Sequence, residues 1–237
     1  MGTHARENVE TIHCEWGASG LAAHAGLCDV AVIVDVLSFS TCVEIAASRG
    51  AVVLPFQWKD DRAAAFAREN DADLAGSRGA AGFSLSPASF LKVREGMRVV
   101  LPSPNGAALS LAARATHVLA GCLRNATAVA RAARAAGQRV LIAPAGERWP
   151  DGSLRPALED WWGAGAVIEA LAGTCSPEAE AARAAFRAVA ERLPVALRDC
   201  VSGRELIERG FREDVRLAAE LDVSDAVPVL RDGAYRG

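Results

Sequence analysis

The stretch from Val30 to Cys42 constrains the fold of this chain more than any other. An unbroken apolar run ends at one carboxylate, Asp35, and is followed by three hydroxyl side chains, Ser38, Ser40 and Thr41. Such a run is typical of a strand buried on both faces of a parallel sheet. In open α/β sheets, ligands bind at the carboxyl ends of such strands. These side chains could therefore hold a divalent cation or a phosphate, or they could simply cap the next helix.

Strand and helix patterns alternate through the first two thirds of the 237 residues. Besides the strand at 30–37, we expect strands over 51–56, 74–76, 98–102, 117–121 and 139–143, with an edge strand over 9–16. Helices are expected between them, over 40–49, 60–70, 107–114 and 125–137. This alternation predicts right-handed βαβ units, and so an α/β fold with a mostly parallel sheet covered by helices.

The last third of the chain is mainly helical in pattern. We expect helices over 157–171, 177–193, 203–209 and 211–221, and then a docked extended tail at 227–230. Because no Gly/Ser-rich or Pro-rich linker sets 157–237 apart, we expect one α/β domain over 1–237 with a helical C-terminal section. Two long loops, 77–96 and 144–156, remain, and loops of that length in compact domains are usually functional or mobile.

Composition excludes several classes of function. The formal net charge is -3 and the arginines are scattered, so we expect no nucleic-acid partner. No apolar run reaches the roughly 20 residues that a membrane-spanning helix needs. The six cysteines show no C-x-x-C spacing, which favours reduced thiols and a cytoplasmic location. The common phosphate-loop, dinucleotide and serine-hydrolase motifs are absent.

Three further polar clusters fall at strand ends or in the long loops. Arg78 lies between glycines and could bind a phosphate, or it could be an ordinary surface arginine. Asn105 and Gly106 follow a strand and could present a helix N-terminus to an anion, or form a simple tight turn. Glu159 and Asp160 open a helix, where acids are often only partners of the helix dipole.

Taken in order, these motifs resemble the 2-phosphosulfolactate phosphatase family from about Asp29 to Leu230. The motifs that carry the resemblance are Val-Asp-Val-Leu (34–37), Gly-Ser-Arg-Gly (76–79), Gly-Phe-Ser-Leu (82–85), Ser-Pro (86–87), Pro-Asn-Gly (104–106), Gly-Cys-Leu-Arg-Asn-Ala (121–126), Ala-Gly-Glu (145–147), Glu-Asp-Trp-Trp-Gly-Ala-Gly (159–165), Ser-Gly-Arg-Glu-Leu (202–206) and Val-Pro-Val-Leu (227–230). Each motif alone is common, and their order and spacing are what make the resemblance specific.

The resemblance implies a Mg²⁺-dependent phosphatase. Family members release phosphate from 2-phosphosulfolactate, giving sulfolactate on a route to coenzyme M. We therefore predict hydrolysis of a small phosphorylated acid. The residues predicted to hold Mg²⁺ and position water are Asp35, Glu159 and Asp160. Those predicted to bind phosphate are Ser38, Ser40, Thr41, Arg78, Asn105 and Gly106.

Several departures from the family pattern fall at this predicted site, and two of them change charge. Ser38 stands where the family usually has Arg, and Ser77 stands where it has Glu. Charge-assisted hydrogen bonds contribute a few kcal/mol each, so we expect 2-phosphosulfolactate itself to be a poor substrate. The alternative is a non-catalytic relative that binds a small anion or a protein partner through the altered cleft. Two copies of the chain could also pair as a homodimer.

Overall fold

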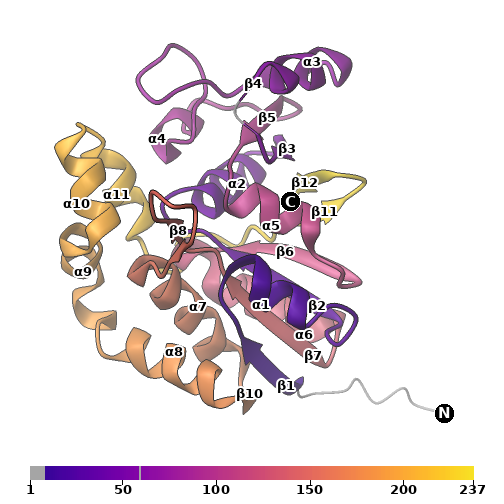
Figure 1. Ribbon diagram of the computed structural model, residues 1–237, viewed down its shortest axis with the longest axis vertical. Helices are drawn as coiled ribbons and strands as arrows, with labels where there is room; N and C mark the ends of the chain where they lie inside the picture. The colour runs from indigo at the N-terminus through magenta and orange to yellow at the C-terminus, as the bar shows by residue number, and fades with distance from the viewer. Residues whose placement is uncertain (1–8, 59) are drawn as a thin grey trace.

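The computed structural model describes residues 9–58 and 60–237. A ten-stranded sheet runs through these residues in the order β10-β1-β7-β2-β6-β11-β12-β3-β5-β4, with helices on both faces (Figure 1). The predicted α/β class with a mostly parallel sheet and a helical C-terminal section is confirmed. Among the described residues, no helix is both long and apolar enough to cross a membrane.

The first five strands in that order form a parallel group. They are β10 (Gly173–Cys175), β1 (Val9–Cys14), β7 (Arg139–Pro144), β2 (Val30–Val34) and β6 (His117–Gly121). The strand at 9–16 was predicted to lie at the edge, which is wrong, because β1 pairs with both β7 and β10. The short β10 gave no strand signal in the sequence, and it covers the edge that β1 would otherwise expose.

A second parallel group lies at the other end of the sheet, with β3 (Val52–Phe56), β5 (Arg98–Pro102) and β4 (Asp73–Leu74). The hairpin of β11 (Val229–Arg231) and β12 (Ala234–Arg236) joins the groups by antiparallel pairing to β6 and β3. The extended tail predicted at 227–230 thus enters the sheet as β11, and the prediction did not include β12. Tyr235 is fully buried there, and its hydroxyl donates to Ser110 Oγ at 2.8 Å.

Alternate residues of β2 point to opposite faces of the sheet, and both faces are covered. Its valines pack against α6 (Ala126–Ala136), α7 (Leu158–Leu171) and α8 (Pro177–Arg187). Ala31 and Ile33 pack against α1 (Gly17–Ala23) and α5 (Gly106–Ala112). Burial on both sides explains why the strand contains no polar residue.

The second strand group is covered in the same way. The cluster on one face includes residues of α2 (Phe39–Ser48) and α4 (Pro87–Phe90), and the cluster on the other includes residues of α3 (Asp61–Glu69). The segment predicted as one helix over 177–193 is broken, because α8 ends at Arg187 and α9 (Leu193–Asp199) begins afresh. Pro194 explains the restart, since proline is tolerated in a helix's first turn but not in its interior.

The last helices carry the chain across the carboxyl ends of the strands. From α9, the chain continues through α10 (Val201–Glu208) and α11 (Arg212–Ala218), and α11 packs against α4 (Figure 1). A separate two-stranded hairpin, β8 (Glu147–Arg148) with β9 (Leu154–Arg155), occupies the loop predicted at 144–156. These segments and the strand ends enclose one cavity.

Candidate active site

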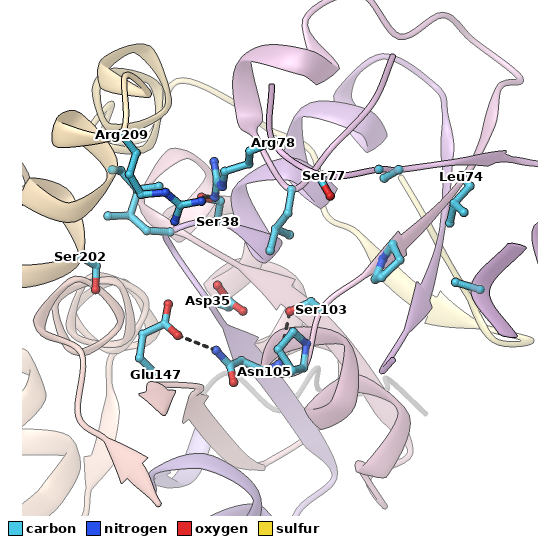
Figure 2. A pocket seen from close by; sticks show the side chains of 18 of the residues that line it. Asp35, Ser38, Leu74, Ser77, Arg78, Ser103, Asn105, Glu147, Ser202 and Arg209 are labelled. Atoms are coloured by element: carbon cyan, nitrogen blue, oxygen red, sulfur yellow. Dashed lines mark hydrogen bonds between the residues drawn. The ribbon is translucent and has the colours of Figure 1, made fainter. Parts of the chain in front are cut away.

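A cavity of about 540 Å³ opens where β2 and β5 end (Figure 2). Its wall combines the turns after these strands, the loop at 76–78, residue 147 of β8 and one face of α10. The polar residues in this wall include Asp35, Ser38, Ser77, Arg78, Ser103, Asn105, Glu147, Ser202, Glu205 and Arg209. Four residues predicted from the sequence, namely Asp35, Ser38, Arg78 and Asn105, are therefore brought together.

Asp35 is fixed by the turns that follow two different strands. Its Oδ1 accepts the Phe39 N–H at 3.1 Å, and its Oδ2 accepts the Gly106 N–H at 2.9 Å. A Cβ on Gly106 would lie 2.7 Å from Asp35 Oδ2, so only glycine permits this approach. The Gly106 N–H, predicted to bind phosphate, is therefore engaged by Asp35. Burial raises the pKa of Asp35, and the two N–H groups offset part of that rise.

The hydroxyls after β2 divide between the cavity and the backbone. Ser38 lies in the cavity wall and its Oγ accepts from Arg78 Nη2 at 2.8 Å. Ser40 donates to the Ile33 carbonyl at 3.0 Å, and Thr41 donates to the Val36 carbonyl at 2.8 Å. Both of these hydroxyls are fully buried. Of the three predicted phosphate-binding hydroxyls, Ser38 is thus the one that the structure places in the wall.

Asp160 connects two segments beneath the cavity. Its Oδ1 accepts the Val36 N–H at 2.7 Å and its Oδ2 accepts the Gly146 N–H at 2.9 Å. Glu159 is 2% exposed and accepts the Cys200 thiol at 3.4 Å. Both acids lie behind the wall, because α7 packs closely on β2. A Cβ on Gly163 would lie 2.6 Å from Val36.

Glu147 is a site residue that the prediction for the catalytic set missed. It lies in the cavity wall, and its Oε2 accepts from Asn105 Nδ2 at 2.9 Å (Figure 2). Burial, followed by the charges of Asp35 and Glu159, raises its pKa to about 7. Burial and the same two charges raise the pKa of Asp160. The signal for Glu147 was its position in Ala-Gly-Glu (145–147), directly after β7.

Asp214 is a second residue that the sequence did not reveal. It is 1% exposed and forms an ion pair with Arg78 across the cavity rim. Its Oδ1 also accepts the Ser86 hydroxyl at 2.6 Å and the Ala88 N–H at 3.1 Å. The predicted phosphate-binding Arg78 is therefore held in place and largely neutralised by a carboxylate from α11.

The cavity is lined by more carboxylates than basic side chains, so its net charge is negative. Asp35 and Glu147 line it together with Asp60, Asp61 and Glu205, and the charge of Glu159 behind the wall raises the pKa of Glu147 and of Asp160. No preformed set of three or more His, Cys, Asp or Glu ligands occurs among the described residues. Mg²⁺ often takes one or two carboxylates and completes its shell with waters and substrate phosphate. Asp35 and Glu147 fit that kind of donor set.

The fold and the cavity define an α/β protein with a charged cavity at the carboxyl ends of parallel strands, the place where ligands bind in open sheets of this class. Comparison with known proteins narrows this class. The model of the 2-phosphosulpholactate phosphatase family matches residues 19–233. The chain belongs to this family.

Curated relatives support the assignment along almost the whole chain. A 2-phosphosulfolactate phosphatase of Methanothermobacter thermautotrophicus is 33% identical over 214 residues, which cover 88% of each chain. Probable 2-phosphosulfolactate phosphatases of Thermus thermophilus and Deinococcus radiodurans are each 36% identical. Those alignments cover 88% and 86% of this chain and 90% and 89% of the relatives.

Proposed function

We propose that this protein hydrolyses a small acidic phosphomonoester of the 2-phosphosulfolactate kind in a Mg²⁺-dependent reaction. The observation that carries the proposal is that Asp35 and Glu147 both line one cavity, in a chain of this family. Two carboxylates facing an anionic substrate would repel it. A divalent cation held by these carboxylates would offset that repulsion, so their presence favours metal-assisted chemistry.

Asp35 and Glu147 are the residues that would hold Mg²⁺. When bound, the ion would neutralise phosphate charge and lower the pKa of a bound water. The metal role predicted for Glu159 and Asp160 becomes indirect in this proposal. Asp160 positions the turn after β2 through the Val36 N–H, and Glu159 adds negative potential from behind the wall.

The remaining wall residues orient the phosphate. Arg78 keeps one face toward the cavity while Asp214 fixes its guanidinium. Ser38 lies beside it and offers a hydroxyl. Asn105 uses its amide nitrogen to donate to Glu147, and the second hydrogen on that nitrogen is available to a substrate oxygen. These groups are fixed before binding, so little side-chain entropy is lost on binding.

Phosphate release from 2-phosphosulfolactate and a panel of small phosphorylated acids tests the proposal. We expect activity with Mg²⁺, none after chelation, and recovery when Mg²⁺ is restored. Glu147→Gln should abolish release and remove the Mg²⁺-induced rise in melting temperature. Glu208→Gln makes the same change on an exposed part of α10 and should affect neither. Full activity of chelated protein, or an unchanged Mg²⁺ shift in Glu147→Gln, would refute the assignment.

A further inference from the structure

One face of α10 lines the cavity, and neither the metal nor the phosphate groups above use it. The four residues of that face are spaced i, i+3, i+4 and i+7, and they are Ser202, Glu205, Leu206 and Arg209. Such spacing places side chains on one side of a helix. At 1.5 Å per residue, Ser202 and Arg209 are about 10 Å apart along the axis, which is long enough to span a small phosphorylated acid.

Two polar groups on this face have no hydrogen-bond or ion-pair partner in the part of the chain that the structure describes. The Ser202 side chain lines the cavity near Glu147 and is 5% exposed, and its Oγ makes no hydrogen bond to any described residue (Figure 2). Within residues 9–58 and 60–237, no carboxylate pairs with Arg209; its guanidinium lies over the Phe211 ring, 5.8 Å from the centroid. Glu205, one turn away, pairs instead with Arg155 at 3.4 Å. A buried hydroxyl without a partner costs free energy unless a ligand supplies one.

Arg78 and Arg209 differ in the charge they offer. Both guanidinium groups lie over the same ring, since Arg78 is 5.4 Å from the Phe211 centroid. Asp214 neutralises Arg78, whereas Arg209 keeps its full charge and points toward Ser38 (Figure 2). Arg209 therefore supplies a cation on the Ser38 side of the cavity from a different element than Arg78.

We propose that Arg209 recognises the acid group of the substrate that does not react, and that Ser202 donates a hydrogen bond to a substrate oxygen nearer Glu147. The inference rests on the proposed function, and it names the part of the site that selects the substrate class. The phosphate lies toward Asp35 and Glu147, and the second anionic group lies toward Arg209. Arg209 would thereby distinguish phosphomonoesters that carry a second anionic group from those that do not.

Two substrates of equal carbon count separate the roles, phosphoglycolate with a second acid group and ethyl phosphate without one. Arg209→Gln should raise KM for phosphoglycolate about 10- to 100-fold, as expected for a lost charge-assisted hydrogen bond. Its KM for ethyl phosphate should stay within about two-fold. Arg209→Lys should recover part of the loss, because lysine keeps the positive charge but lacks the two parallel N–H donors of a guanidinium. Arg212→Gln, an exposed change of the same charge three residues on, should match wild type.

Ser202→Ala provides an independent measurement. It removes a hydroxyl that bonds to none of the described residues, so the melting temperature should not fall, while KM for phosphoglycolate should rise about three- to ten-fold. A lower melting temperature with unchanged KM would mean that Ser202 is structural. An equal loss on both substrates in Arg209→Gln, or no loss on either, would overturn the role given to Arg209.

Calorimetric binding of phosphoglycolate with Mg²⁺ keeps this test separate from that of the reaction. If wild type binds it and Arg209→Gln binds at least about ten-fold more weakly, the inference holds even where no phosphate is released. In that case the proposed function alone fails. If wild type releases phosphate and Arg209→Gln binds as tightly as Arg212→Gln, the inference alone fails. No binding to wild type overturns it as well.

Discussion

Replacing Asp214 by Asn should strongly destabilise this protein, although the two side chains have nearly the same shape. Both oxygens of Asp214 accept hydrogen bonds, Oδ2 from Arg78 and Oδ1 from Ser86 and Ala88. An amide has only one acceptor oxygen. Whichever way it turns, its NH₂ group faces a donor, and the Arg78 charge is left without its counter-ion in a site where its side chain is 11% exposed.

Removing one partner of a buried ion pair costs about 3–5 kcal/mol. For a chain of this length each kcal/mol lowers the melting temperature by about 2–4 °C, so we expect a fall of about 6–20 °C. Asp225→Asn is the matched control, because Asp225 pairs with Arg131 at 3.3 Å on the surface, where the two side chains are 94% and 69% exposed. Exposed pairs of this kind contribute about 0–1 kcal/mol.

Urea unfolding of both variants measures the difference directly. The double variant Arg78→Gln with Asp214→Asn should lose less than the sum of its two single changes, since neither charge is then left buried alone. A loss below about 1 kcal/mol in Asp214→Asn, equal to that of Asp225→Asn, would show that this pair behaves as a surface pair.

Three further outcomes are expected. Glu147 has its pKa raised from 4.5 to about 7, so it binds its proton more tightly in the folded state, and its contribution to the free energy of unfolding falls as pH rises through that window. In urea unfolding of chelated protein, the free energy of unfolding of Glu147→Gln should therefore rise relative to that of wild type from pH 5 to 7.5. A difference that does not change with pH would contradict the raised pKa of Glu147. Tyr235→Phe should cost about 0.5–1.5 kcal/mol, and Tyr235→Ala about 3–5 kcal/mol, in the same assay. Equal losses would mean that packing of the ring is unimportant. Gly106→Ala should lose phosphate release and bound Mg²⁺, because its Cβ would displace Asp35; retention of both would show that the turn can adjust.

The sequence predicted the parts of the fold that have strong local patterns. The valines of β2 form an uninterrupted apolar run, and Asp35 and Asn105 follow strand ends, so their meeting at one edge of the sheet was foreseeable. The hairpin of β11 and β12 could not be foreseen, because its strands are three residues long and the strands they pair with, β6 and β3, are distant in sequence. Short strands of that kind carry too little periodicity to be recognised.

The residues of the candidate site also differ in how far the sequence could predict them. Asp214 and Arg209 belong to the last helices, where charged residues usually form a solvated face. Only the packing of α11 against α4 brings Asp214 to Arg78, and no local spacing reports that contact. Ser40 and Thr41 were predicted as ligands because hydroxyls at strand ends often bind anions, whereas here Ser40 donates to a carbonyl of β2 and Thr41 to a carbonyl of the turn that follows it.

The position of the hairpin in the sheet also bears on how the protein is made. A ribosome releases β2, β3, β5 and β6 long before residues 229–236, and the strands that separate β6 from β3 are therefore the last to arrive. Until then each group presents an open edge of unpaired N–H and C=O groups, which can pair with another chain. Damage to these last strands should consequently appear first as lost yield of soluble protein in cells, and only afterwards as altered catalysis.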